Sequence, residues 1–156
     1  MLTGTIAAAA PPPTAVPGEA DLPVLLDTIR ANRRALVAVN LKLDEQQSAR
    51  FWPIYDRYQR EMNAIGDRIA ALVKDYAANF HNLSNDKALQ LIREYLAAEA
   101  DRIKVRQAYL DEFTKALPGQ TVARFYQMEN KMDAVIRYEL AANIPVVEDG
   151  SSRPAK

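Results

Sequence analysis

The sequence predicts an all-α fold, an elongated antiparallel bundle of four helices that contains one long helical hairpin and dimerises. Three observations lead to this prediction. Apolar residues recur every three or four positions through most of the chain, which is the spacing of one helix face. No segment shows the strict alternation that is typical of a half-buried strand. Short turn sequences separate the helical segments, so neighbouring helices are expected to run antiparallel.

The first helix is expected to run from about residue 22 to residue 40. Asp21 can cap it, and Pro23 falls in the first turn, where the missing N–H loses no hydrogen bond. An apolar stripe follows at helical spacing: Leu22, Leu25, Leu26, Ile29, Leu36 and Val37. Three arginines near the middle are interpreted as an exposed basic patch: Arg30, Arg33 and Arg34.

The second helix is expected to begin at Asp44 and to reach about Phe80. Asp44 is a good N-cap, and Gln47 stands where a capping box reaches back to the cap. Leu43 can pack against the first turn. The apolar seam alternates steps of four and three, as in a coiled coil: Phe51, Tyr55, Tyr58, Met62, Ile65, Ile69, Leu72, Tyr76 and Phe80. Pro53 predicts a kink near residues 50–53 or a restart of the helix at residue 53.

The third helix is expected after a turn at residues 79–85, capped by Ser84 or Asn85, and to end at about Ala116. Its predicted seam is again spaced by threes and fours: Leu89, Ile92, Leu96, Glu99, Ile103, Arg106, Leu110, Phe113 and Leu117. The two charged members, Glu99 and Arg106, either pair with each other or with a partner helix, or they mark where the seam faces water.

The fourth helix is expected to follow the turn at Pro118-Gly119 and to end at about Asn143. Its apolar residues are Val122, Phe125, Met132, Ile136 and Leu140. Ile144 precedes Pro145, and a residue before proline avoids the helical region, so the helix is expected to stop there.

The ends of the chain differ in composition from this helical region. We expect three parts: a Pro/Ala-rich disordered tail at residues 1–20, a helical domain at 21–145 and a flexible tail at 146–156. Small apolar residues followed by prolines resemble the end of a secretory signal, although the charged start of a signal is missing. We favour export; a trimmed or mis-assigned start and a plain tail are the alternatives. No stretch is long enough to span a bilayer.

Composition narrows the classes of function. The 20 basic residues equal the 20 acidic ones, so the electrostatic footprint of a nucleic-acid-binding protein is missing. The absence of cysteine excludes disulfides, thiol catalysis and cysteine-based metal sites. The single histidine, His81, lies in a predicted turn and is expected to be exposed and idle. No nucleophile has a base nearby in the sequence and no glycine-rich loop is present, so we predict a non-enzymatic protein without cofactor or metal.

Two aromatic residues stand one step off their seams at matching places in the chain. Trp52 and Tyr126 each follow an Ala-Arg-Phe sequence. Amphipathic aromatic residues are favoured at binding surfaces, so both are candidates for a binding face or a dimer interface. Half-buried packing within the chain is the alternative.

A short repeat connects these two places. The segment from Leu43 to Phe51 and the segment from Leu117 to Phe125 share the leading Leu, a Gln three positions later and the closing Ala-Arg-Phe. This repeat indicates two equivalent helix starts. Chance similarity between two helix starts is the alternative.

The helix starts resemble the LTxxQ motif of the Spy/CpxP family of bacterial periplasmic proteins. The first copy matches at Leu43 and Gln47, with Asp44 in the place of the capping Thr, and the second matches at Leu117, with its Gln one place early. The resemblance extends over about residues 22–144. The residues that carry it, including the flanking aromatic positions, are Leu43, Asp44, Gln47, Phe51, Leu117, Gln120 and Phe125.

This resemblance implies a homodimer of long, curved helical hairpins that forms a cradle in the periplasm. It implies ATP-independent, chaperone-type binding of unfolded polypeptides, or regulation of an envelope-stress sensor protein as an adaptor. Basic residues are expected to form a local face of the cradle together with Trp52 and Tyr126: Arg30, Arg33, Arg34, Arg57, Arg60 and Arg68. A purely structural helical protein, in which dimerisation buries the aromatic surface, is the third hypothesis.

Overall fold

The computed structural model describes residues 21–147, which form four α-helices, and shows no strand among those residues. The helices are α1 (Asp21–Leu41), α2 (Glu45–Asn79), α3 (Asn85–Ala116) and α4 (Gly119–Asn143), with a 3₁₀ turn η1 (Phe80–Asn82) between α2 and α3. The predicted all-helical fold with four helices is therefore confirmed for this part of the chain. The expected tails lie outside it, apart from residues 146–147. So do the side chains of Asp21, Leu22, Pro23, Leu25, Leu26 and Ile29.

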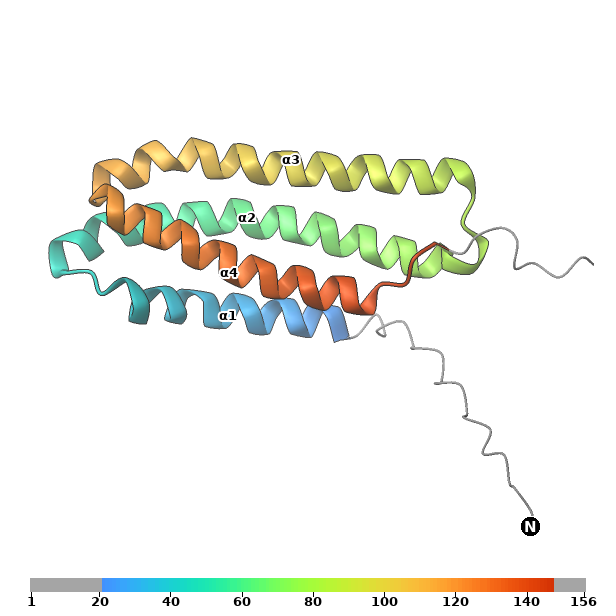
Figure 1. Ribbon diagram of the computed structural model, residues 1–156, viewed down its shortest axis with the longest axis horizontal. Helices are drawn as coiled ribbons and strands as arrows, with labels where there is room; N and C mark the ends of the chain where they lie inside the picture. The colour runs from blue at the N-terminus through green and yellow to red at the C-terminus, as the bar shows by residue number, and fades with distance from the viewer. Residues whose placement is uncertain (1–20, 148–156) are drawn as a thin grey trace, which may run out of the picture.

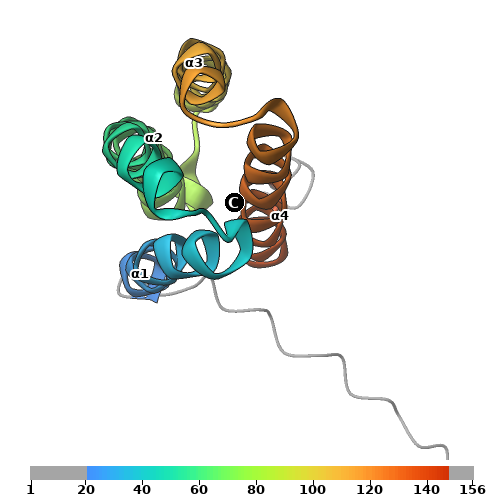
Figure 2. The ribbon, with the colours of Figure 1, turned by 90° about the vertical axis from the view of Figure 1, so that its left-hand side faces the viewer.

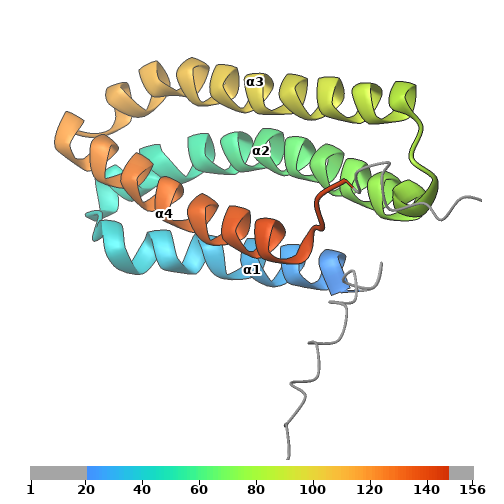
Figure 3. The same ribbon diagram turned by 45° about the vertical axis from the view of Figure 1, so that its right-hand side comes forward.

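The helices lie side by side along one long axis, and α2 and α3 form a hairpin through η1 (Figures 1 and 3). Seen along that axis, α1, α2 and α3 follow one another along one side, and α4 lies across from them (Figure 2). α4 begins next to the end of α3 and runs diagonally towards α1 (Figure 1). As a result α3 and α4 diverge towards the end of the molecule that contains η1.

The predicted capping box at the start of α2 is confirmed. The backbone N–H of Gln47 donates to the Asp44 carboxylate at 2.8 Å, and the backbone N–H of Asp44 donates to Oε1 of Gln47 at 3.2 Å. These bonds satisfy donors that a helix start otherwise leaves without partners. Together with Leu43, which packs against the core, they fix where the longest helix begins.

Removing this cap is expected to have a measurable but moderate effect. Asp44→Ala should lower the free energy of unfolding by about 1 kcal/mol, because the first turn of α2 loses its side-chain acceptor. Asp44→Asn keeps an acceptor and should stay close to the wild type. Urea denaturation measures both, and an equal loss in the two variants would show that charge, not the hydrogen bond, stabilises the helix start.

Pro53 does not interrupt α2, so the predicted restart of the helix at this residue is wrong. The helix continues from Glu45 to Asn79 with Pro53 inside it. Proline removes only the bond to the carbonyl of residue 49. Ala49 is exposed, so water can reach the acceptor that proline leaves open.

The core is densest at the end where α2 begins and α3 ends. The α2 seam is buried from Phe51 to Ile69, as predicted. Phe113 of α3 and Phe125 of α4 lie 4.8 Å apart between ring centroids, and Phe51 lies 5.3 Å from Phe125. Edge and tilted contacts between such rings add to the burial of apolar area. This aromatic core holds α2, α3 and α4 together at one end.

The predicted seam of α3 is wrong along most of its length. The buried residues of this helix are Leu91, Ala98, Tyr109, Phe113 and Ala116. Five apolar residues of the predicted seam are exposed, and we call them the outer stripe: Leu89, Ile92, Leu96, Ile103 and Leu110. The helix is rotated so that Ala98 packs against Ile65 and Ile69 of α2, and the Tyr109 hydroxyl donates to Glu61 at 2.6 Å.

Candidate binding surfaces and a buried charge cluster

The outer stripe is an apolar row along one side of α3. Its members follow one another at steps of three, four, seven and seven residues, so they share one face of the helix. Leu96 is 59% exposed and Ile103 is 53% exposed. Exposed residues of both charges occur on the same helix: Arg93, Glu94, Lys104 and Asp111. Single exposed apolar residues are ordinary, but an ordered row of them indicates a contact surface.

An apolar groove opens where α3 and α4 diverge. Its volume is about 560 Å³, which lies in the range of small-molecule sites. Most of its lining is aliphatic or aromatic, from α2, α3, α4 and the segments next to them: Ile69, Leu72, Val73, Tyr76, Leu83, Ala88, Leu91, Ile92, Tyr95, Arg137, Leu140, Ala141, Ile144 and Val147. Two of its polar groups are engaged. The Tyr76 hydroxyl donates to the carbonyl of Pro145 at 2.8 Å, and Arg137 donates to Glu99 at 2.7 Å.

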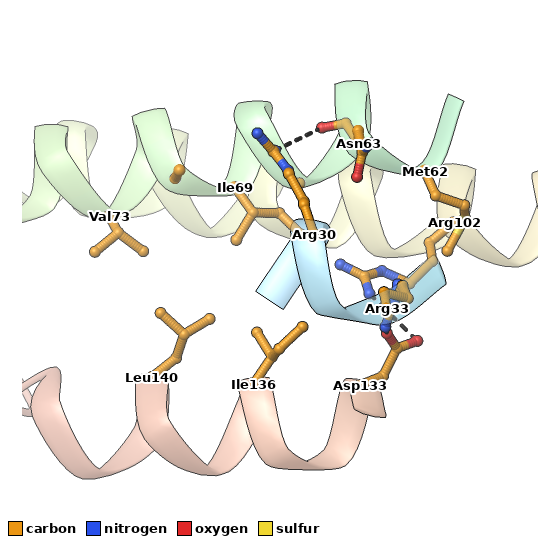
Figure 4. A pocket seen from close by; sticks show the side chains of 12 residues that line it. Arg30, Arg33, Met62, Asn63, Ile69, Val73, Arg102, Asp133, Ile136 and Leu140 are labelled. Carbon is orange, nitrogen blue, oxygen red and sulfur yellow. Dashed lines mark hydrogen bonds and ion pairs between the residues drawn. The ribbon is translucent and has the colours of Figure 1, made fainter. Parts of the chain in front are cut away.

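A smaller cavity of about 60 Å³ lies next to this groove. The two share three lining residues, Ile69, Val73 and Leu140. Figure 4 shows how the side chains of the smaller cavity change from one end to the other. Val73 and Leu140 lie at one end. Arg33, Arg102 and Asp133 lie at the other, and Arg30 lies between the two ends with its guanidinium directed towards Asn63.

The charged end of this cavity belongs to a buried cluster of ion pairs between α1, α3 and α4. Arg33 donates to Asp133 and lies 3.6 Å from Glu129, which is fully buried. Two arginines of α3 reach the same aspartate, Arg102 at 3.6 Å and Arg106 at 3.3 Å. The Tyr58 hydroxyl and the Gln59 amide each donate to Glu129 at 3.3 Å.

The expectation of an exposed basic patch at three arginines of α1 is therefore wrong for Arg33. Its side chain is only 9% exposed, because it reaches between the helices to Asp133. Its two neighbours lie nearer the surface. Arg30 is half-buried and pairs with Asp67 of α2 at 2.5 Å. Arg34 pairs with Asp56, and its guanidinium carbon lies 4.3 Å from the ring centroid of Trp52.

Burial and pairing oppose each other in this cluster. Burial raises the pKa of Glu129, and the charge of Arg33 offsets this only in part. Burial lowers the pKa of Arg33, but the negative charges of Glu129 and Asp133 more than compensate, so the pKa of Arg33 is raised. Arginine is protonated throughout the ordinary pH range, so Arg33 carries its charge. Ionisation of Glu129 is less favourable than that of an exposed glutamate.

This predicts a pH dependence that belongs to Glu129. A carboxyl whose pKa is higher in the folded state binds more protons folded than unfolded, between the two pKa values. Its contribution to the free energy of unfolding is greatest below about pH 4.3, the unfolded pKa, and is lost as pH rises through the raised value. Glu129→Gln has the same shape and no titration. The variant should therefore gain stability relative to the wild type as pH rises from about 4 to 7.

Urea midpoints at several pH values measure this difference. Glu94→Gln, at an exposed position of α3, is the matched control because it removes one charge outside the cluster. A constant difference between Glu129→Gln and the wild type across the pH range would contradict the assignment.

The residues of the repeated motif have structural positions in these elements. Phe51, Phe125 and Leu117 are buried in the aromatic core, and Gln120 is exposed in the first turn of α4. They place two helix starts next to the same core.

The residues predicted to form a binding surface make contacts between different pairs of helices and do not gather at one place. Trp52 is half-buried, with its ring 5.0 Å from Phe51. Tyr126 is half-buried too, and its hydroxyl donates to the backbone carbonyl of Arg106 at 2.6 Å. Three arginines of α2 are exposed: Arg57 pairs with Glu112, Arg68 pairs with Asp101 at 2.8 Å, and Arg60 lies between them in sequence.

Sequence reasoning missed the charge cluster, although the sequence holds a signal for it. Glu129 and Asp133 continue the row begun by Val122 and Phe125 on α4, at steps of three and four. Arg33 stands four residues before Val37 on the buried face of α1. Charged residues that continue an apolar row from two helices are candidates for a buried ion pair.

Residues 21–147 contain no helix that is both long and apolar enough to cross a membrane. Within the same residues, no three potential metal-binding side chains of His, Cys, Asp or Glu are grouped to hold an ion. No protein-family model, curated protein or solved structure matches the chain.

Proposed function

We propose that this chain is a non-enzymatic helical protein that binds apolar segments of other polypeptides along the outer stripe of α3, in the manner of an ATP-independent chaperone. The observation that carries the proposal is the exposure of five large apolar side chains on one face of a helix. Folding within one chain normally buries such a row. A partner that covers it removes apolar surface from water at about 25 cal/mol per Å².

The shape of the outer stripe favours variable partners. It is a row along a single helix, and only Ile92 also lines the groove. A surface of this kind selects apolar character more than the shape of a particular side chain. The mixed charges on the same helix favour neither acidic nor basic partners. Both properties suit the binding of many unfolded chains.

We propose the predicted homodimer as the alternative use of the outer stripe. Leu89, Leu96, Ile103 and Leu110 are spaced by seven residues, the repeat that packs against another helix. A second copy of this chain is therefore the alternative occupant, which corresponds to a purely structural protein. A dedicated envelope sensor protein, which a regulatory adaptor would bind, is the third possible occupant.

The periplasmic location is also proposed. It rests on the resemblance of the helix starts and on the small apolar residues near the N-terminus.

The test measures aggregation of an unrelated, chemically denatured protein without ATP, at near-equimolar ratio. The wild type should suppress aggregation. Leu96→Glu/Ile103→Glu places two charges in the middle of the outer stripe and should abolish suppression. The matched control is Val39→Glu/Val135→Glu, which makes the same change at exposed positions of α1 and α4 and should leave suppression intact.

Sedimentation of the same proteins separates the alternatives. A wild-type dimer that Leu96→Glu/Ile103→Glu converts to a monomer, with no suppression by the wild type, would assign the outer stripe to a second copy. Absence of suppression from a folded monomer would overturn the proposal and favour a dedicated partner.

A further inference from the structure

We infer that the apolar groove and the small cavity next to it form a site for a single-chain amphiphile with a carboxylate head, such as a long-chain fatty acid. The acyl chain lies in the groove, and the carboxylate points towards Arg33 and Arg102. This site is independent of polypeptide binding on the outer stripe, because it lies between helices and uses different groups, with Ile92 alone in common.

The lining of the groove favours an acyl chain over a peptide. An extended peptide carries an N–H and a C=O at almost every residue, and each needs a partner when it is buried. The groove offers few partners, since Tyr76 already donates to Pro145 and Arg137 already donates to Glu99. An acyl chain needs no hydrogen bonds, and each buried CH₂ contributes about 0.8 kcal/mol.

The charged end of the small cavity supplies donors for a carboxylate. The Nε atoms of Arg33 and Arg102 are buried and have no hydrogen-bond partner. Arg102 Nε lies 3.5 Å from Oε1 of Glu99, which makes an ion pair but no hydrogen bond. Buried donors without partners are costly, and a ligand oxygen that reaches them removes this cost.

The charge of the cavity lining fits an anion. The lining itself contains three guanidinium groups, from Arg30, Arg33 and Arg102, and one carboxylate, from Asp133. Each arginine also pairs with a carboxylate outside the lining: Asp67, Glu129 and Glu99, respectively. Arginine favours carboxylate partners because its planar donors match the two oxygens. On α4, the side chains change from Leu140 through Ile136 to Asp133 along successive turns (Figure 4). This gradient matches a molecule with an apolar tail and an anionic head.

Calorimetric titration with laurate and with methyl laurate tests the inference on the folded protein. The wild type should bind laurate, and it should bind methyl laurate roughly tenfold or more weakly, because the ester lacks the charge that strengthens hydrogen bonds to arginine. Arg102→Gln should remove most of this preference. Arg93→Gln, at an exposed position of α3 outside both linings, is its control and should keep the preference.

A second pair of variants tests the apolar part. Ala141→Trp fills the groove from α4 and should weaken laurate binding at least tenfold, about 1.4 kcal/mol. Ala142→Trp adds the same side chain at the next exposed position, outside the groove lining, and should bind as the wild type does. Equal binding of laurate and its ester, unchanged binding by Ala141→Trp, or no binding to the wild type would each overturn the inference, whatever the outcome for polypeptide binding.

Discussion

Arg33→Met is expected to lower the free energy of unfolding by about 3–5 kcal/mol. The substitution keeps an apolar stem of similar length but removes the charge that faces Glu129 and Asp133. Both carboxylates are buried, so Glu129 would lose its arginine from α1, and Asp133 would keep only Arg102 and Arg106 of α3. Breaking a buried ion pair from one side has costs of this size. Urea or thermal unfolding followed by circular dichroism measures the loss.

The control for this prediction is an ion pair at the surface. Arg68 pairs with Asp101 across α2 and α3, but both side chains are well exposed, so Arg68→Met should cost far less stability than Arg33→Met. The combined variant Arg33→Met/Glu129→Gln should recover part of the loss, because Glu129 no longer carries a charge without its arginine, while Asp133 keeps Arg102 and Arg106. A cost for Arg33→Met no larger than that of Arg68→Met would contradict the buried cluster.

Phe113→Ala is expected to cost about 3–5 kcal/mol, whereas Leu110→Ala, three residues earlier, should change stability by less than about 0.5 kcal/mol. Phe113 is fully buried among Phe51, Tyr58 and Phe125, so its removal leaves a cavity between three helices. Leu110 is exposed on the outer stripe, and surface substitutions have small effects.

The contrast between these two residues checks the orientation of α3. Both belong to one seam by their spacing, so a helix packed on that seam would lose stability in both variants. Comparable losses would show that α3 buries the predicted face, and would remove the outer stripe as a binding surface. The difference in free energy of unfolding is therefore more informative than either value alone.

The start and seam of α2 could be predicted because local signals agree there. Asp44 and Gln47 fix the first turn by their own hydrogen bonds, and the seam from Phe51 onwards has one buried face. Pro53 is a local signal that predicted a kink or a restart of this helix. A single lost backbone bond at an exposed turn did not outweigh the packing of the aromatic residues on both sides of it.

The rotation of α3 could not be predicted because spacing alone does not say which of two faces meets a neighbour. The face that packs contains the small Ala98 and presents Arg102 and Arg106 to Asp133 of α4. Which face of α3 is buried therefore depends on residues about 30 positions away in the sequence, and no local pattern of α3 indicates it. The same holds for Arg33, whose partner Asp133 comes from the last helix.

The groove depends on tertiary geometry for the same reason. Leu72, Tyr76 and Leu140 have the spacing of core residues, and the sequence predicts them as such. They line an open space because α4 runs diagonally away from α3 (Figures 1 and 3). The direction of a helix is set by its contacts along the whole length, here the aromatic core at one end and the pairing with Arg33 further along.

Photo-crosslinking from position 103 tests most directly whether the outer stripe holds other polypeptides. A photoreactive phenylalanine analogue replaces Ile103 in one protein and Val39 of α1 in another, and each is illuminated with an unfolded client. Polypeptide binding on α3 predicts adducts of one protein and one client from position 103, and few from position 39. Adducts from position 103 that contain only two copies of this chain, or equal labelling of clients from both positions, would contradict it.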